Sequence, residues 1–261
     1  MQRASDGRFD DDPQAVFERW DDFLAWAYHA PFAGAAVFDG NDLGAPVPQP
    51  RQVFAIGLNY ADHAAESSFT LPSDPVVFTK FPSSIGAPNT DVELSGDSVD
   101  YEVELVAVIG KRAFHVLAEH AWDHVAGLTI GQDISDRDVQ LRGPAPQFSL
   151  GKSFPNFAPI GPVVVTADEF PDRDAIGLRT ELEVEGIRQT KQDGNTRELI
   201  FSVPELIARL SAVLVLYPGD LIFTGTPSGV GLGMTPPQYL HRGEVLISTI
   251  DGIGSIRNRL T

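Results

Sequence analysis

The sequence predicts a mixed α+β fold that is mainly β. Short apolar segments rich in β-branched residues recur along the chain and are bounded by glycine, proline or polar residues, as buried strands are. These segments outnumber the stretches with helical periodicity and do not alternate strictly with them, which argues against a doubly wound sheet. The predicted strands cover residues 53–58, 76–80, 100–110, 127–131, 162–166, 178–186, 220–224 and 244–250.

Helices are expected to be few and short. Apolar residues recur at roughly helical spacing in three stretches, 13–29, 116–126 and 203–216. Proline and glycine concentrate in residues 40–51, which is the best candidate for a boundary. We therefore expect residues 1–50 to form a small, partly helical N-terminal region with an extended linker, and residues 51–261 to form the main domain.

Composition excludes several classes of function. Of the 261 residues, 43% are hydrophobic, which is enough for a sizeable core. The net charge of −17 argues against binding to nucleic-acid phosphates or anionic membranes. The absence of cysteine excludes disulfides, thiolate catalysis and iron–sulfur clusters. No signal peptide or membrane-spanning stretch is evident, so a cytoplasmic location is expected.

Two glutamates stand at the start of the predicted strand 100–110. Because successive side chains of a strand point to opposite faces, Glu102 and Glu104 share one face. Adjacent carboxylates on an apolar strand repel each other and resist desolvation, so a positive charge is expected between them. A hard divalent cation such as Mg²⁺, Mn²⁺ or Ca²⁺ is the simplest candidate. The alternative is a strand end with one glutamate in solvent and the other in a salt bridge.

A second acidic cluster begins where the predicted strand 127–131 ends. Its Asp-x-x-Asp-x-Asp spacing does not fit an EF-hand loop, which needs a glycine at its sixth position. For Asp136 and Asp138, a role as the cap and first turn of a helix is as good an explanation as a role in a functional site. Asp133 comes earlier and is the better candidate for a third metal-binding oxygen.

Three other positions each have an ordinary explanation beside a functional one. His63 and Glu66 would share a helix face, where the carboxylate could orient the imidazole as a base, although a solvated surface pair is commoner. His120 and His124 have metal-ligand spacing, but their surroundings favour an exposed face. Lys152 lies between apolar stretches and either snorkels to solvent or donates to a carboxylate within a site.

Residues 224–231 form a glycine-rich loop after a predicted strand. This loop lacks the Lys-Ser/Thr pair of a P-loop and the spacing of a dinucleotide fingerprint, so nucleotide binding is not expected. Its backbone N–H groups and the Thr226 hydroxyl could hold an anion. No Gly-x-Ser-x-Gly elbow is present, which disfavours a serine hydrolase of that type.

Taken together, five motifs resemble those of the fumarylacetoacetate hydrolase superfamily and follow that family's order over about residues 53–257. The motifs are IGLNYADHAAE at 56–66, DYEVEL at 100–105 with VIGK at 108–111, DISDRDVQ at 133–140, GKSF at 151–154 with PIGP at 159–162, and PGDLI at 218–222 with TGTPSGVG at 224–231.

The resemblance implies a fold, a cofactor and a set of roles. It implies a barrel-like mixed β-roll with short flanking helices, usually dimeric, so we expect a homodimer. It implies Mg²⁺ or Mn²⁺, with Ca²⁺ as a further occupant in crystals, held by Glu102, Glu104 and Asp133. The same resemblance implies catalytic roles for His63, Glu66 and Lys152, and substrate contacts from Tyr60, Arg137, Gln140, Gly225 and Thr226.

The activity implied by the resemblance is metal-dependent hydrolysis of a C–C bond in a 2,4-dioxo acid of the acylpyruvate type. In it, a His–Glu pair activates water, and the metal and Lys152 stabilise the enolate that leaves. The alternatives are an isomerase, decarboxylase or hydratase-type lyase acting on a 2-oxo-dioate, and a non-catalytic, metal-dependent binder of 2-oxo acids. The partner in each case is a small anionic 2-oxo acid, whose tail should contact residues 64–74, 142–149 and 232–240.

Overall fold

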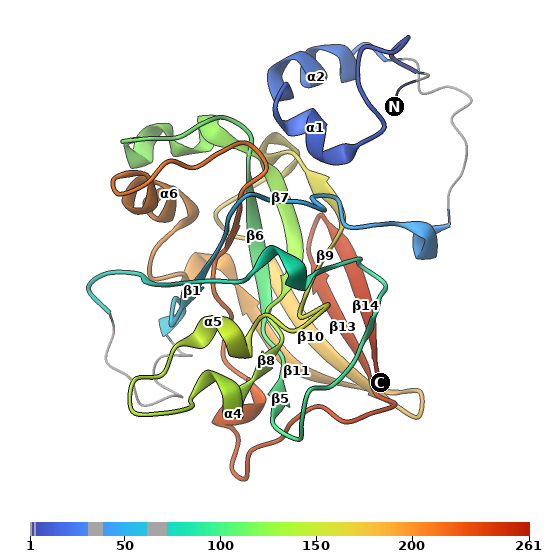
Figure 1. Cartoon of the computed structure of the whole chain (residues 1–261), viewed down its shortest axis with the longest axis vertical. Coiled ribbons are helices and arrows are strands. Elements are labelled where there is room, and N and C mark those ends of the chain that lie inside the picture. Colours follow the sequence, from blue (N-terminus) through green and yellow to red (C-terminus); the bar gives the residue numbers. More distant parts are fainter. Residues whose placement is uncertain (1, 3, 31–38, 62–71) are drawn as a thin grey trace.

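A computed structural model describes residues 2, 4–30, 39–61 and 72–261, and these are mainly β, which confirms the predicted fold class (Figure 1). A seven-stranded sheet has the strand order β2-β1-β12-β6-β7-β9-β3. A five-stranded sheet has the order β11-β10-β13-β14-β4, and β5 pairs with β8 alone. Facing contacts of β10 with β6, β13 with β7 and β14 with β9 bring the two larger sheets together.

The strands of the seven-stranded sheet are β1 (Val53–Gly57), β2 (Val76–Thr79), β3 (Ile85–Gly86), β6 (Val103–Ile109), β7 (Val125–Gln132), β9 (Ala158–Val165) and β12 (Leu221–Phe223). Those of the five-stranded sheet are β4 (Asp91–Val92), β10 (Gly177–Val184), β11 (Ile187–Asn195), β13 (Val245–Ile250) and β14 (Gly254–Leu260). The separate pair is β5 (Val99–Asp100) and β8 (Ser135–Asp136).

The helices are short. The α-helices are α1 (Pro13–Phe17), α2 (Trp20–Ala27), α4 (Arg137–Gln140), α5 (Phe148–Gly151) and α6 (Val203–Ser211). The 3₁₀ helices are η1 (Gly40–Asp42), η2 (Pro82–Ser84), η3 (Ala118–His124), η4 (Ala167–Glu169), η5 (Thr196–Glu198) and η6 (Gly231–Gly233).

Each predicted strand overlaps a strand of the structure. Five strands were not predicted: the two-residue strands β3, β4 and β8, and the longer strands β11 and β14. The strand β11 is polar and lies at a sheet edge, so it lacks an apolar signal. In β14 the buried positions are Ile256, Asn258 and Leu260, which alternate with exposed arginines. Because Asn258 is polar, the sequence does not show a regular alternation of apolar and polar residues. Both strands complete the five-stranded sheet.

The predicted helices are shorter than expected. The single helix expected over 13–29 is wrong, because it is divided between α1 and α2. The stretch 116–126 contains η3, a 3₁₀ helix, rather than an α-helix. Helix α6 ends at Ser211, and its start is fixed by a capping box in which Ser202 and Glu205 bind each other's backbone.

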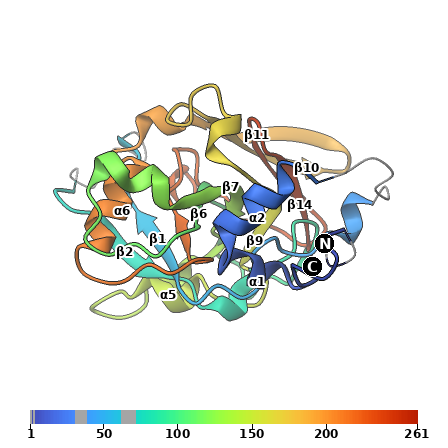
Figure 2. The ribbon, with the colours of Figure 1, turned by 90° about the horizontal axis from the view of Figure 1, so that it is seen from above.

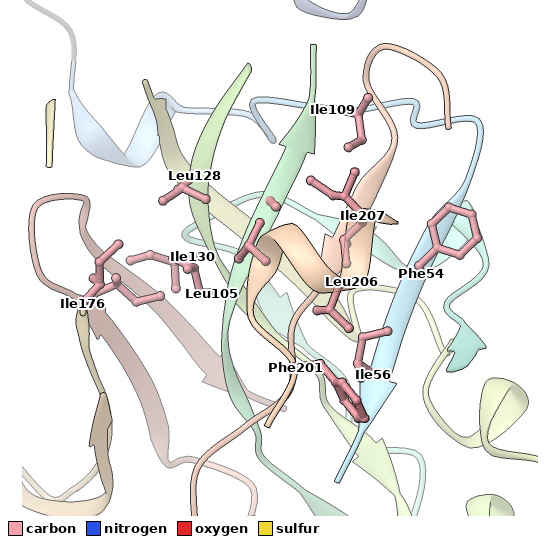
Figure 3. Packing of buried hydrophobic residues seen from close by; sticks show 14 of the residues in the cluster. Phe54, Ile56, Leu105, Ile109, Leu128, Ile130, Ile176, Phe201, Leu206 and Ile207 are labelled. Atoms are coloured by element: carbon pink, nitrogen blue, oxygen red, sulfur yellow. The ribbon is translucent and has the colours of Figure 1, made fainter. Parts of the chain in front are cut away.

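The strand β6 is buried along its whole length and separates two hydrophobic clusters. On one face, Val103 and Leu105 join residues of β7, β10 and α6, and the close view shows Leu105 beside Ile130 and close to Leu206 (Figure 3). On the other face, Val106 and Val108 pack with β1 and β12. Glu102 and Glu104 continue this second face, so the acidic residues occupy the end of an otherwise apolar row.

The helices lie at opposite ends of the molecule. Helices α1 and α2 are at one end, where Phe17 packs into the cluster on the second face of β6 (Figures 1 and 2). Helices α4 and α5 are at the other end (Figure 1). Asp136 caps α4 by accepting a hydrogen bond from the Val139 N–H, as one of the two sequence interpretations expected. The glutamate end of β6 is thus close to α4 and α5 and far from the N-terminal helices.

Glycine at position 151 permits the close approach of α5 to α4. A Cβ atom there would lie 2.5 Å from the backbone nitrogen of Gln140 and 2.8 Å from the carbonyl oxygen of Asp136. Both are backbone atoms that cannot rotate away. Any larger side chain would therefore push apart the two helices that lead into Lys152.

We expect Gly151→Ala to lower the free energy of unfolding by about 1–3 kcal/mol, because it overpacks a rigid contact. The measurement is urea denaturation followed by circular dichroism. Gly44→Ala is the matched control, since a Cβ at Gly44 meets nothing within 4 Å. Equal stability of the two variants would contradict the packing argument.

Candidate metal centre

Three carboxylates converge at the end of β6. Glu102, Glu104 and Asp133 are buried, and one oxygen from each lies within 4.8 Å of the others. The β6–β7 pairing produces this convergence, because Val103 is opposite Gln132 and the Asp133 N–H donates to the carbonyl oxygen of Glu102. Glu102 and Glu104, which are two residues apart at the start of β6, and Asp133, which follows the end of β7, therefore lie on the same side of the sheet.

Lys152 lies within this acidic cluster. Its Nζ is 2.6 Å from Asp133 Oδ2, 2.9 Å from Glu102 Oε2 and 2.8 Å from the Ser135 hydroxyl. The side chain is buried rather than extended to solvent, so of the two sequence interpretations the structure supports the one in which Lys152 points into a site. Burial opposes the ammonium form, but Asp133 and Glu102 outweigh burial and raise the pKa of Lys152.

Lys80 is a second buried lysine in the cluster, and the sequence analysis did not assign it to the site. It follows β2, its Nζ lies 2.5 Å from Asp133 Oδ1, and it also donates to the carbonyl oxygen of Lys152. Burial lowers the pKa of Lys80, against the attraction of Asp133. The available signal was a lysine placed directly after an apolar strand, where a charge needs a buried partner.

Of the three carboxylates, Glu104 is the one whose negative charge is least compensated by basic groups. Its Oε2 accepts a hydrogen bond of 2.7 Å from the Gly225 N–H. Burial, reinforced by the charges of Asp133 and Glu102, raises the pKa of Glu104 well above its ordinary value. Gly225 has a φ of +100°, and a Cβ there would lie 2.8 Å from Cβ of Asn59. The glycine-rich loop therefore orients a candidate metal ligand, while the predicted contact of Gly225 with substrate stays a prediction.

Arg137 connects the cluster to a neighbouring loop. Its guanidinium pairs with Glu102 Oε1 at 2.7 Å and with Asp100 Oδ2 at 2.6 Å, and it donates to Gln140. Asp100 also accepts hydrogen bonds from the N–H groups of Gly231 and Leu232. The structure thus brings the predicted site residues Arg137 and Gln140 together. Asp100, which was not predicted as a site residue, pairs with Arg137.

The donor set fits a hard divalent cation. Four buried carboxylates, those of Asp100, Glu102, Glu104 and Asp133, are joined to only three basic groups, those of Lys80, Arg137 and Lys152. Burial raises the pKa of Glu104, and the negative charges of Asp133 and Glu102 raise it further. Carboxylate oxygens are the ligands that Mg²⁺ and Mn²⁺ prefer, so Glu102, Glu104 and Asp133 would hold the ion.

The remaining predicted site residues differ in placement. The Thr226 hydroxyl donates to the carbonyl oxygen of Val103 and accepts from Gln192, so it lies at the site in a fixed orientation. Tyr60 is buried, its hydroxyl has no hydrogen-bond partner among the described residues, and burial together with Glu104 raises its pKa. His63 and Glu66 fall in 62–71, outside the described residues.

A cavity of about 370 Å³ opens beside the acidic cluster. Glu102, Arg137 and Lys152 are at one part of its lining, with Gln140 and Thr226. The rest of the described lining is apolar and comes from β1, β2, α5 and the loop after β12. The segments 142–149 and 232–240 were expected to contact the substrate tail, and Phe148 and Leu232 from them line the cavity. The contribution of β2 to the lining was not expected.

The fold and the site define a β-rich protein with a buried acidic centre suited to a divalent cation, next to a ligand-sized cavity. The family model described as Fumarylacetoacetate (FAA) hydrolase C-terminal matches residues 52–261. The chain therefore belongs to the fumarylacetoacetate hydrolase family, as its motifs predicted.

Individual proteins show the same relationship. Human oxaloacetate tautomerase FAHD2A, mitochondrial, is 41% identical over 218 residues, which are 83% of this chain and 68% of that protein. A crystal structure of a Mycobacterium smegmatis protein, named provisionally as HpcE, has a TM-score of 0.93 at 50% identity and covers 100% of this chain and 91% of its own. The structure of 5-carboxymethyl-2-hydroxymuconate delta-isomerase from the same species has a TM-score of 0.72 at 37% identity, with coverage of 84% and 81%.

We expect Glu104→Gln to separate metal binding from folding. Without divalent cations, the variant should melt at or above the wild-type temperature, because it removes a poorly compensated buried charge. With Mg²⁺ it should lose at least about tenfold in apparent affinity, seen as a smaller magnesium-dependent rise in melting temperature. Glu93→Gln, at an exposed position, is the control. A wild-type response to Mg²⁺ in Glu104→Gln would refute the assignment of this ligand.

Proposed function

We propose that this protein is a divalent-metal-dependent hydrolase that cleaves a C–C bond in a 2,4-dioxo acid of the acylpyruvate type. The observation that carries the proposal is the buried group of Glu102, Glu104 and Asp133 with Lys152 among them, of which Glu102 and Lys152 line a ligand-sized cavity. A cavity with a few convergent polar groups and an apolar wall is the usual form of a small-molecule site.

The described residues would bind and orient the substrate. Arg137 is fixed by its carboxylate partners, so it presents positive charge to the cavity without reorganisation, and Lys152 supplies a second positive charge to the lining. Gln140 accepts from Arg137 through its Oε1, which leaves its amide NH₂ to donate to a substrate oxygen. A bound divalent cation would supply further positive charge against the negative charge that develops on the 2-oxo oxygen.

The reaction balances with water as the only co-reactant. Water adds to the 4-oxo carbon, the bond between C3 and C4 breaks, and its electron pair remains on C3. A proton then returns to C3, and the products are pyruvate and the carboxylic acid of the acyl group. Within this proposal, His63 with Glu66 removes the proton from water, as the motif resemblance implies.

A tautomerase or isomerase is the second candidate function. It is favoured by the relatives, because one is named as an oxaloacetate tautomerase and another as a delta-isomerase. Both reactions need the same buried positive charge at a 2-oxo group and a group that moves a proton at C3, but they need no attack by water. A non-catalytic binder would show magnesium-dependent stabilisation by 2-oxo acids and no turnover.

The location and assembly proposed here follow the sequence expectations. We propose a cytoplasmic homodimer, although the human relative carries a mitochondrial name. None of the described helices has the length and apolar character needed to cross a membrane.

We expect purified protein with Mg²⁺ to release pyruvate from acetylpyruvate or a longer acylpyruvate, measured by coupling to lactate dehydrogenase. His63→Ala should lower kcat by about 10²- to 10⁴-fold, because a positioned general base contributes that much. His120→Ala, which changes an exposed histidine of η3, is the control and should keep wild-type kcat. Full hydrolytic activity in His63→Ala would show that the proposed base is wrong.

Nuclear magnetic resonance in D₂O separates the two candidate functions. Hydrolysis yields pyruvate with deuterium at its methyl group and one equivalent of carboxylic acid. A tautomerase instead exchanges the C3 hydrogens and leaves the carbon skeleton whole. Exchange of oxaloacetate or an acylpyruvate without cleavage would favour the second candidate over the first.

A further inference from the structure

The wall of the cavity beside the metal centre is apolar over its outer part. It is formed by Val76 and Phe78 of β2, Phe148 of α5, Leu141 after α4, and Val230 and Leu232 of the loop after β12. Leu141 is 46% exposed and Leu232 is 37% exposed, so much of their apolar surface is uncovered. Covering such a wall with apolar groups is favourable, whereas a charged group placed against it loses hydration without gaining a partner.

The wall is held in place from two sides. Asp100 accepts hydrogen bonds of 2.8 Å and 2.9 Å from the N–H groups of Gly231 and Leu232, and the same carboxylate pairs with Arg137. The Phe78 and Phe148 rings meet edge to face with 5.7 Å between centroids. The polar end and the apolar wall are therefore positioned relative to each other before a ligand binds.

The basic groups of the described lining are already paired at the polar end. Arg137 is bound by Asp100 and Glu102, and Lys152 is bound by Glu102 and Asp133. The described lining contains no other lysine or arginine. A carboxylate at the far end of a ligand would meet Leu141, Phe148 or Leu232, and no unpaired basic group of the described lining would be there to bind it.

The cost of desolvation points the same way. A second carboxylate at the far end of a ligand would lose hydration against the apolar part of the lining, and the described lining offers it no unpaired basic group, which is costly.

We propose that this site selects 2-oxo acids with an uncharged, apolar tail and discriminates against those with a second carboxylate. The inference rests on the proposed function, since it assigns the tail of the acylpyruvate that the site would cleave. The proposed selectivity disfavours oxaloacetate, the dicarboxylate in the name of the human relative, as a ligand of this chain. The cavity of about 370 Å³ has room for about twelve non-hydrogen atoms, if each takes about the 30 Å³ of a water molecule, which limits the tail to a few carbons beyond the head.

The first experiment compares two substrates that differ only at the end of the tail. Butanoylpyruvate and succinylpyruvate have the same number of acyl carbons, but the first ends in a methyl group and the second in a carboxylate. With Mg²⁺, kcat/KM for succinylpyruvate should be lower by at least about 100-fold. Lengthening the acyl chain from acetyl to butanoyl should raise kcat/KM by about fourfold for each methylene. Equal kcat/KM for the matched pair would overturn the proposal and leave the hydrolase function standing.

A binding measurement keeps this inference separate from the proposed activity. The pair 2-oxohexanoate and 2-oxoadipate lacks the second carbonyl, so neither can be hydrolysed by the proposed reaction. In the presence of Mg²⁺, 2-oxohexanoate should raise the melting temperature more than 2-oxoadipate at equal concentration. This result without any acylpyruvate hydrolysis would sink the hydrolase function and support the tail selectivity, whereas a larger rise with 2-oxoadipate would overturn the selectivity.

A substitution in the wall provides the converse test. Leu141→Arg places a guanidinium at the exposed edge of the cavity, where it can pair with a terminal carboxylate. The ratio of kcat/KM for succinylpyruvate to that for butanoylpyruvate should rise by at least about tenfold. Leu150→Arg is the matched control, because Leu150 is 67% exposed, lies on α5 and does not line the cavity. A ratio that moves equally in both variants would show that general charge, not the wall, sets the selectivity.

Discussion

The burial of an acidic cluster at the end of β6 is the constraint on which the rest of the site depends. Carboxylates within 4.8 Å of one another and shielded from water repel strongly, and folding tolerates them only because basic groups lie among them. Lys80 and Lys152 supply two of these groups and Arg137 the third. Burial, together with the charges of Asp133 and Glu102, still raises the pKa of Glu104, so a cation has a place beside it.

The fold places this cluster by simple rules of strand geometry. The two-residue period of β6 puts Glu102 and Glu104 on one face, and the antiparallel partner β7 ends beside them at Asp133. The apolar residues that continue the same face, such as Val106, anchor the strand in the core. Gly151 lets α5 approach α4 and so delivers Lys152, while the Gly225 N–H orients Glu104. Rigid elements thus carry most of the described site.

The sequence predicted the local parts of this arrangement and missed the distant ones. The shared face of Glu102 and Glu104 follows from alternation along one strand, and the motif order identified the family. Lys80 reaches Asp133 from a strand far away in the sequence, and such a pairing leaves no local pattern. The strand β11 was missed because a polar edge strand has no apolar period, and its Gln192 supports Thr226 through a contact of the same long-range kind. The apolar share of β2 in the cavity is likewise a product of tertiary packing.

The most direct measurement of the central claim is the anomalous diffraction signal of crystals soaked in Mn²⁺. We predict one strong peak among the carboxylates of Glu102, Glu104 and Asp133, with Mn–O distances of about 2.2 Å and displacement of the Lys152 ammonium from at least one of its carboxylate partners. No peak at this position at millimolar Mn²⁺, with Lys152 still bound to both Glu102 and Asp133, would contradict it. The cluster would then be a self-contained ion-pair network rather than a metal centre.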